Sequence, residues 1–123
     1  TEAITQFFFS ADTYLRFRDR CAAAGIGLDI IPGIMPVFDF GKVASFARKC
    51  GEPIPSWVAD RFDGLEEKPE MHYQVAAATA ASLCERLASE SVSRVHLYSC
   101  NRVDLTLAIA RLITHPEPIS KAA

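Results

Sequence analysis

The stretches AITQFFF at residues 3–9, LDIIPGIM at residues 28–35 and VHLYS at residues 95–99 decide the fold of this chain. Each is short, apolar and rich in branched or aromatic residues, which is typical of a strand covered on both faces. Pro32 and Gly33 are expected to break the ladder near the end of the second strand, because proline offers no backbone donor. Helical patterns lie between the strands, so the sequence predicts a parallel sheet with right-handed crossovers.

Five helices are expected around these strands. The first ends at Gly25, and the others cover about residues 40–50, 56–63, 70–90 and 103–113, with Asp39 as the cap of the second helix. The predicted order is strand, helix, strand, two helices, helix, strand, helix. The tail from His115 carries two prolines and is expected to fray. We therefore divide the chain into a folded part at residues 1–114 and a flexible tail at residues 115–123.

Composition excludes several classes of function. The chain has 123 residues, is half hydrophobic and has a net charge of −2, without a basic stripe that would favour nucleic acid. No apolar run approaches the ~20 residues of a membrane span. Its four cysteines form no CxxC pair, so we expect reduced thiols, no metal site and a cytoplasmic location. The chain opens at Thr1 directly into a strand-like segment, as a piece from inside a domain would, although a processed terminus would look the same.

Three strand–helix units leave the architecture open. A closed (β/α)8 barrel takes about 250 residues. Three parallel strands alone would leave two unpaired apolar edges exposed. The chain is therefore either a small open sheet or part of something larger.

Three motifs in order resemble the last three strands of the methylenetetrahydrofolate reductase family. They are ITQFFF at residues 4–9, IIPGIMP at residues 30–36 and HLYSCNR at residues 96–102. The intervening YLRFRDRC at residues 14–21 and IPSW at residues 54–57 are also similar to that family. The resemblance covers roughly residues 3–113. The Ser99-Cys100 pair departs from the Thr-Leu associated with the third motif.

The resemblance implies an α/β fold, namely a partial TIM (β/α)8 barrel that contributes the last three βα units with parallel strands and an extra helix. The family binds FAD and uses NADH or NADPH to reduce 5,10-methylenetetrahydrofolate to 5-methyltetrahydrofolate, in one-carbon and methionine metabolism. It commonly forms homo-oligomers. Its proton-donating glutamate and most of its flavin site belong to earlier strands, so no catalytic residue is expected in this segment, and the chain alone is expected to be inactive and poorly folded.

Gln6 is the first candidate binding residue. It lies in an otherwise apolar strand, where a buried amide without partners costs about 1–3 kcal/mol. The residues alone favour an amide satisfied by neighbouring backbone. The resemblance instead implies contact with the pterin of folate and with the nicotinamide, since an amide both donates and accepts.

Three further candidates depend on the resemblance. Arg102 follows the third strand, and its family counterpart reaches the carboxylates of the folate tail, which a guanidinium binds bidentately. Phe46 corresponds to a phenylalanine that stacks on the rings of the pterin or the nicotinamide, although core packing is equally compatible with its helical position. Lys42 stands where relatives carry a glutamine that contacts folate, so only a contact with a carboxylate remains for it. Tyr98 is expected to have a structural role.

Two other interpretations remain open at this point. The chain could be a small non-catalytic α/β module that binds a partner through its sheet edge. It could also belong to another flavin-dependent TIM-barrel enzyme, such as a proline-dehydrogenase-like protein, whose substrate lacks a pterin.

Overall fold

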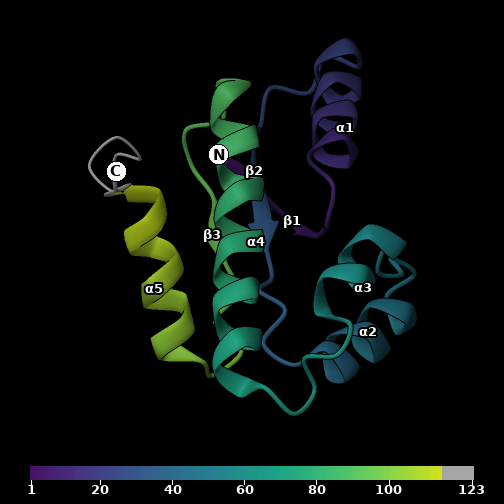
Figure 1. Cartoon of the computed structure of the whole chain (residues 1–123). Coiled ribbons are helices and arrows are strands. Elements are labelled where there is room, and N and C mark those ends of the chain that lie inside the picture. The colour runs from purple at the N-terminus through teal and green to yellow at the C-terminus, as the bar shows by residue number, and fades with distance from the viewer. Residues whose placement is uncertain (115–123) are drawn as a thin grey trace.

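The computed structural model describes residues 1–114, and the expected flexible tail at residues 115–123 lies outside the described residues. Figure 1 shows a small parallel sheet with helices packed against it. The strands and helices are β1 (Glu2–Phe7), α1 (Ala11–Ala23), β2 (Asp29–Ile34), α2 (Phe40–Lys49), α3 (Ser56–Phe62), α4 (Pro69–Ser89), β3 (His96–Leu97) and α5 (Val103–Thr114). This order confirms the predicted alternation of strands and helices.

The sheet has three strands in the order β1-β2-β3, and both neighbouring pairs are parallel. Ile4 pairs with Ile31, whereas Phe7 pairs with Gly33, so Thr5 and Gln6 together face Pro32 alone. This irregularity lies at the expected break, because Pro32 has no N–H to give to the ladder. The third strand is shorter than the expected residues 95–99, although the Tyr98 N–H still donates to the carbonyl of Ile34 at 2.9 Å.

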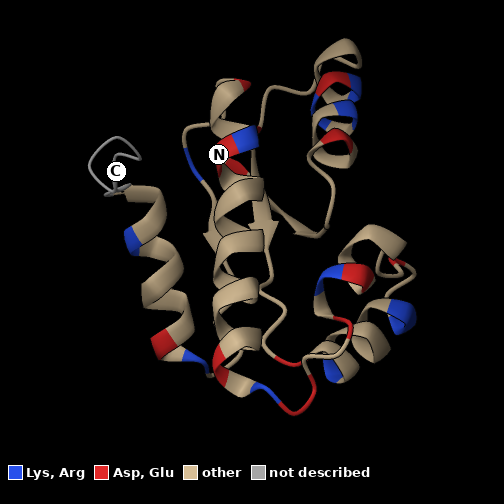
Figure 2. Cartoon of the chain, in the orientation of Figure 1, with Lys and Arg blue, Asp and Glu red and all other residues tan. Residues whose placement is uncertain are grey.

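The long helix α4 covers the sheet and holds much of the core. Figure 2 shows charged residues near the two ends of α4, with an uncharged ribbon between them. Small alanines on this helix pack inward together with Cys84 and Leu87, and α5 and α1 contact its sides. The small side chains let the helix approach its neighbours closely. The core therefore lies between α4, the sheet and the flanking helices.

Local signals end the helices largely as the sequence indicates. The Asp39 side chain accepts a hydrogen bond from the Lys42 backbone N–H at 3.0 Å and so caps α2. Gly25 and Gly51 follow α1 and α2 with φ values of +77° and +75°, a left-handed conformation that glycine adopts without steric cost. Helix α3 begins at Ser56, as the sequence predicts, with Pro55 at the capping position before it.

The expectation that both faces of the first strand are covered was wrong. Side chains of β1 alternate, and the face with Ile4 and Gln6 is exposed, with Ile4 50% accessible. An apolar groove of about 490 Å³ runs along this outer strand, lined in part by Ile4, Phe17, Ile26 and Leu28. We call it the β1 groove. The opposite flank also exposes apolar side chains, because Val103, Leu107 and Leu112 of α5 are largely accessible.

Candidate functional site

The carboxyl ends of the parallel strands place the candidate residues at one edge of the sheet. Gln6 lies near the end of β1, α2 follows the end of β2, and Arg102 follows the end of β3. Parallel α/β proteins build their ligand sites at this edge, since the connecting loops meet there. The topology thus brings every sequence-predicted residue to the same edge.

Gln6 is exposed, so the expectation of a buried amide was wrong. Among the described residues, nothing packs over its face of β1 closely enough to bury it. Its Nε2 donates to the carbonyl oxygen of Cys50 at 3.4 Å, which is a long hydrogen bond. The amide is partly satisfied by backbone, as the residues alone suggested. Its oxygen accepts no hydrogen bond within residues 1–114 and is left available to a ligand.

Phe46 lies in the second half of α2, one turn before Cys50, the residue that Gln6 bonds. Its ring stacks on Phe7 of β1, with centroids 5.6 Å apart and planes 25° apart. The side chain is nevertheless 48% exposed, so it is not an ordinary core residue. The Cys50 N–H donates to the carbonyl of Phe46 at 3.1 Å, and the Cys50 carbonyl accepts from Gln6. The Gln6 amide and the Phe46 ring are therefore linked indirectly, through Cys50 and Phe7, near the carboxyl end of β1.

Lys42 precedes Phe46 by one helical turn, so both side chains lie on the same side of α2. The Lys42 side chain is exposed, and it makes no hydrogen bond or ion pair within the described part of the chain. Its ammonium group can reach a ligand that lies over Phe46, but the flexible side chain gives the charge no fixed geometry.

Arg102 is held by its backbone and by an aromatic ring. Its N–H donates to the Ser99 carbonyl at 2.8 Å, and its own carbonyl accepts from Thr106. The preceding Cys100 and Asn101 have φ values of 50° and 61°, which turns the chain sharply after β3. The guanidinium carbon lies 5.3 Å from the centre of the Phe38 ring. This cation–π contact orients the charge without using its N–H donors.

Arg102 lines a cavity of about 580 Å³ formed by the ends of α2, α4 and α5, together with Phe38, Phe40 and Tyr73. We call it the carboxyl-edge cavity. Three carboxylates, Asp39, Glu66 and Asp104, also line it, yet none lies within ion-pair distance of Arg102 in the described residues. Asp39 is already committed to capping α2. The cavity therefore offers one unpaired guanidinium to a planar anion.

The structure brings some candidates together and separates others. Gln6 bonds to Cys50, one helical turn after Phe46, and Lys42 lies one turn before Phe46. Arg102 lines the carboxyl-edge cavity, whereas Gln6 lines the β1 groove. That these two side chains grip one ligand from its two ends stays a prediction.

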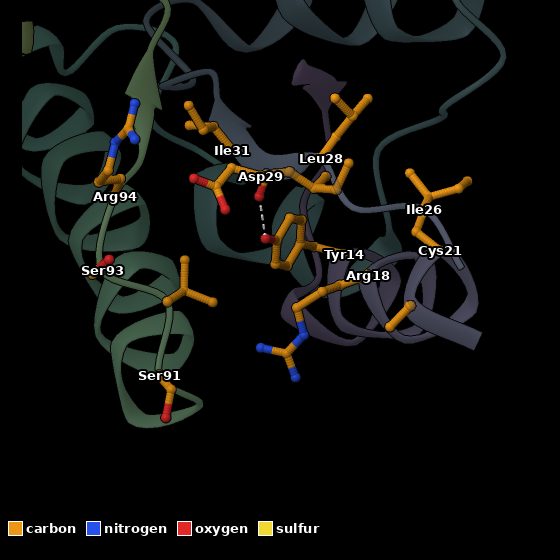
Figure 3. A pocket seen from close by; sticks show the side chains of 13 residues that line it. Tyr14, Arg18, Cys21, Ile26, Leu28, Asp29, Ile31, Ser91, Ser93 and Arg94 are labelled. Carbon is orange, nitrogen blue, oxygen red and sulfur yellow. Dashed lines mark hydrogen bonds between the residues drawn. The ribbon is translucent and has the colours of Figure 1, made fainter. Parts of the chain in front are cut away.

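A further pocket at the opposite end of the strands does not share these properties. Figure 3 shows this space of about 280 Å³, with Arg18 and Arg94 reaching it from different elements. Arg94 is paired with Glu2 at 2.6 Å, and Arg18 donates to the Glu90 carbonyl at 2.9 Å. Both guanidinium groups thus already have partners within the chain, so this amino-end pocket is a weaker candidate for an anion site.

Comparisons with known proteins identify the family. The family model described as Methylenetetrahydrofolate reductase matches residues 2–114. The chain belongs to the methylenetetrahydrofolate reductase family. No described helix is long and apolar enough to cross a membrane.

Bacterial methylenetetrahydrofolate reductases are similar to most of this chain. The 5,10-methylenetetrahydrofolate reductase of Escherichia coli is 44% identical over 111 residues, which cover 90% of this chain and 38% of that protein. The enzyme of the same name from Pectobacterium carotovorum is 43% identical over 111 residues, or 90% of this chain and 37% of that protein. Methylenetetrahydrofolate reductase (NADH) 1 of Zea mays is 28% identical over 98 residues, covering 80% of this chain and 16% of that protein. The chain thus spans less than two fifths of the bacterial relatives' length.

Two contributors to the site were not found by sequence reasoning. Phe38, under the guanidinium of Arg102, was not singled out, although an aromatic in the loop after β2 is a natural partner for a cation after β3. Thr5 was not singled out either, yet it accepts hydrogen bonds from Gly33 in β2 and from Tyr98, which follows β3. Tyr98 has the expected structural role, because its hydroxyl donates to the Thr5 carbonyl at 2.9 Å.

All four cysteines lie in the described part of the chain and are free there, and their reduced state stays a prediction. Burial raises the pKa of Cys84 from its ordinary value of 9.0 to about 11, and the nearby charge of Glu85 adds to this effect. Burial also raises the pKa of Cys100, next to the candidate Arg102. Neither thiol has the lowered pKa of a nucleophile.

Cys84 is expected to resist alkylation in the folded protein. A rise of its pKa from 9.0 to about 11 lowers the thiolate fraction at pH 8 about a hundredfold, and only the thiolate reacts. Iodoacetamide labelling followed by peptide mass spectrometry measures the rate in a longer relative that carries this chain in place of its own matching segment, with the same protein denatured as the control. Equal labelling of Cys84 in the folded and denatured protein would show that α4 does not bury it.

Proposed function

We propose that this chain supplies the last three βα units, with an extra helix, of a flavin-dependent (β/α)8 barrel that reduces 5,10-methylenetetrahydrofolate to 5-methyltetrahydrofolate. The observation that carries the proposal is the carboxyl edge of the sheet, to which β1 brings the exposed Gln6 amide and α2 brings the half-exposed Phe46 ring. The family match over residues 2–114 supports the same reaction. NADH or NADPH would be the reductant, and we propose a cytoplasmic, homo-oligomeric enzyme.

The barrel is supported by the two uncovered flanks of the sheet. The β1 groove and the apolar face of α5 are the surfaces that neighbouring βα units would cover. A parallel sheet is normally buried on both faces, and closure removes its edges. The inward face of such a barrel would contain Ile4 and Gln6, the face of β1 that is exposed in this chain.

Gln6 and Phe46 fit a flat heterocycle that has both donors and acceptors on its edge. The Phe46 ring offers a stacking surface, and the free Gln6 oxygen accepts from a ring N–H or an amide. We assign these two residues to the pterin of folate and, in turn, to the nicotinamide. Lys42, one turn away, would meet a carboxylate of the folate rather than its rings.

The flavin would be held mainly by the rest of the barrel. The described residues fit only the edge of such a site, since they offer the Gln6 amide and the Phe46 ring but no glycine-rich phosphate loop. When bound, FAD supplies hydride transfer to the one-carbon unit. This chain's contribution is to bind and orient the folate, and we place no catalytic proton donor and no metal ligand in it.

Arg102 is assigned to the glutamate tail of folate. The Phe38 ring holds its guanidinium at 5.3 Å and leaves the N–H groups free for bidentate contact with a carboxylate. A lysine at this position would lack both the planar fork and the stacking geometry.

A hybrid protein tests the proposal. The full 123-residue chain replaces the matching segment of the Escherichia coli relative, and flavin content and methylenetetrahydrofolate reduction are measured. We expect a yellow, active enzyme. A folded hybrid that binds flavin but does not reduce the folate would contradict the proposal and favour a barrel with another substrate. A hybrid that folds without flavin would favour a binding module.

Arg102→Ala in this hybrid is expected to raise the KM for folate about 10- to 100-fold, because a hydrogen-bonded charge contributes about 1.5–3 kcal/mol. The kcat should change far less, since the tail is remote from the reacting carbon. Arg16→Ala is the matched control, because Arg16 is exposed on α1, away from the carboxyl edge. Equal KM values for the Arg102 and Arg16 variants would show that Arg102 does not bind the folate.

A further inference from the structure

The backbone of β1 is irregular at the residue that faces the proposed ligand. Thr5 and Gln6 together oppose Pro32, so β1 contains one residue more than β2 across this step. Such bulges redirect a side chain, and they are common beside binding sites. The direction of Gln6 is therefore set by whatever holds this step in place.

The Gln6 side chain makes few hydrogen bonds that would fix its direction. Its only hydrogen bond within residues 1–114 is the 3.4 Å contact with the Cys50 carbonyl. Its neighbour Thr5, in contrast, is bonded on both of its oxygens. The Thr5 hydroxyl accepts from the Gly33 N–H at 2.9 Å, and the Thr5 carbonyl accepts from the Tyr98 hydroxyl at 2.9 Å.

The two bonds connect all three strands at one point. The Thr5 hydroxyl takes the place of a backbone acceptor for the Gly33 N–H, next to Pro32, which has no N–H of its own. Tyr98 reaches from the end of β3 across β2 to β1, and Gly33 leaves the room for its ring. A Cβ at Gly33 would lie 2.7 Å from Cε2 of Tyr98.

We propose that Thr5 and Tyr98 are positioning residues that aim Gln6 at its ligand. We call the Thr5–Gly33–Tyr98 arrangement the strand clamp. The inference rests on the proposed function, in which Gln6 binds the rings of folate and nicotinamide. Neither Thr5 nor Tyr98 needs to touch the ligand for the clamp to act.

Tyr98→Phe in the active hybrid tests the clamp by kinetics. Removing one hydroxyl bond is expected to lower kcat/KM for folate about fivefold. Tyr14→Phe is the matched control, because the Tyr14 hydroxyl also donates to a carbonyl of the sheet, that of Ile30, at the other end of the strands (Figure 3). We expect little change in kcat/KM for the Tyr14 variant.

The decisive measurement is the double variant. If Tyr98 acts through Gln6, then Tyr98→Phe has no further effect on kcat/KM once Gln6→Ala is present. A merely structural role would give the same loss in both backgrounds. That result, or equal losses for Tyr14→Phe and Tyr98→Phe, would overturn the proposal.

Crystal structures of hybrid variants test the geometry without relying on activity. Thr5→Val keeps the shape of Thr5 but removes the acceptor for the Gly33 N–H, whereas Thr5→Ser keeps that acceptor. We expect Gln6 to turn away in Thr5→Val and to keep its direction in Thr5→Ser. An unchanged Gln6 direction in Thr5→Val would refute the clamp, whether or not the hybrid is active. A hybrid without reductase activity would refute only the proposed function.

Discussion

Gly33→Ala is expected to lower the free energy of unfolding by about 3 kcal/mol, the upper end of the cost of overpacking. The new methyl group would lie 2.5 Å from the Thr5 carbonyl oxygen and 2.7 Å from the Tyr98 ring. The first of these atoms is backbone in a paired strand, so it cannot move aside cheaply. The substitution therefore forces β1 away from β2 and breaks the strand clamp.

Urea denaturation of the hybrid measures this loss, with Gly27→Ala as the matched control. A Cβ at Gly27 would meet nothing within 4 Å, and Gly27 has no left-handed backbone. Its replacement should change stability by less than about 0.5 kcal/mol. Similar midpoints for the two variants would mean that Tyr98 does not cross Gly33 as described.

The isolated 123-residue chain is expected to show no cooperative unfolding transition, no bound flavin and no reductase activity. Its sheet exposes the β1 groove on one flank and the apolar face of α5 on the other. Val103 on α5 is 65% accessible, and Ile4 on β1 is 50% accessible. Apolar flanks and an unpaired strand edge favour association over a stable monomer.

Thermal denaturation followed by circular dichroism, together with the flavin absorbance of the purified chain, checks this expectation. The hybrid is the control, because it places the same residues between neighbouring units. A sharp transition with yellow flavin bound to the isolated chain would contradict both the expectation and the proposed division of the flavin site.

The order of strands and helices was predictable because it depends on local signals. Asp39 caps α2 through a neighbour three residues away, and Gly25 and Gly51 take left-handed conformations that few other residues adopt. Apolar runs separated by helical patterns were sufficient to predict a parallel sheet. None of these features requires knowledge of distant contacts.

Exposure and side-chain pairing were not predictable in the same way. The run around Gln6 reads as a buried strand, but its burial depends on layers that only the three-dimensional arrangement supplies. Phe38 and Arg102 lie far apart in the sequence and meet only because β2 and β3 are neighbours. The roles of Gln6, Phe46, Lys42 and Arg102 remain predictions for the hybrid to test.

Pro32 also protects the sheet against slippage. A strand that shifts by one residue turns its outward side chains inward, and flat ladders allow such errors during folding. Here the missing N–H of Pro32 and the capture of the Gly33 N–H by the Thr5 hydroxyl make this step of the ladder unlike its neighbours. A misaligned β1 would leave the Gly33 N–H without this acceptor, so the native register has a lower free energy than its neighbours.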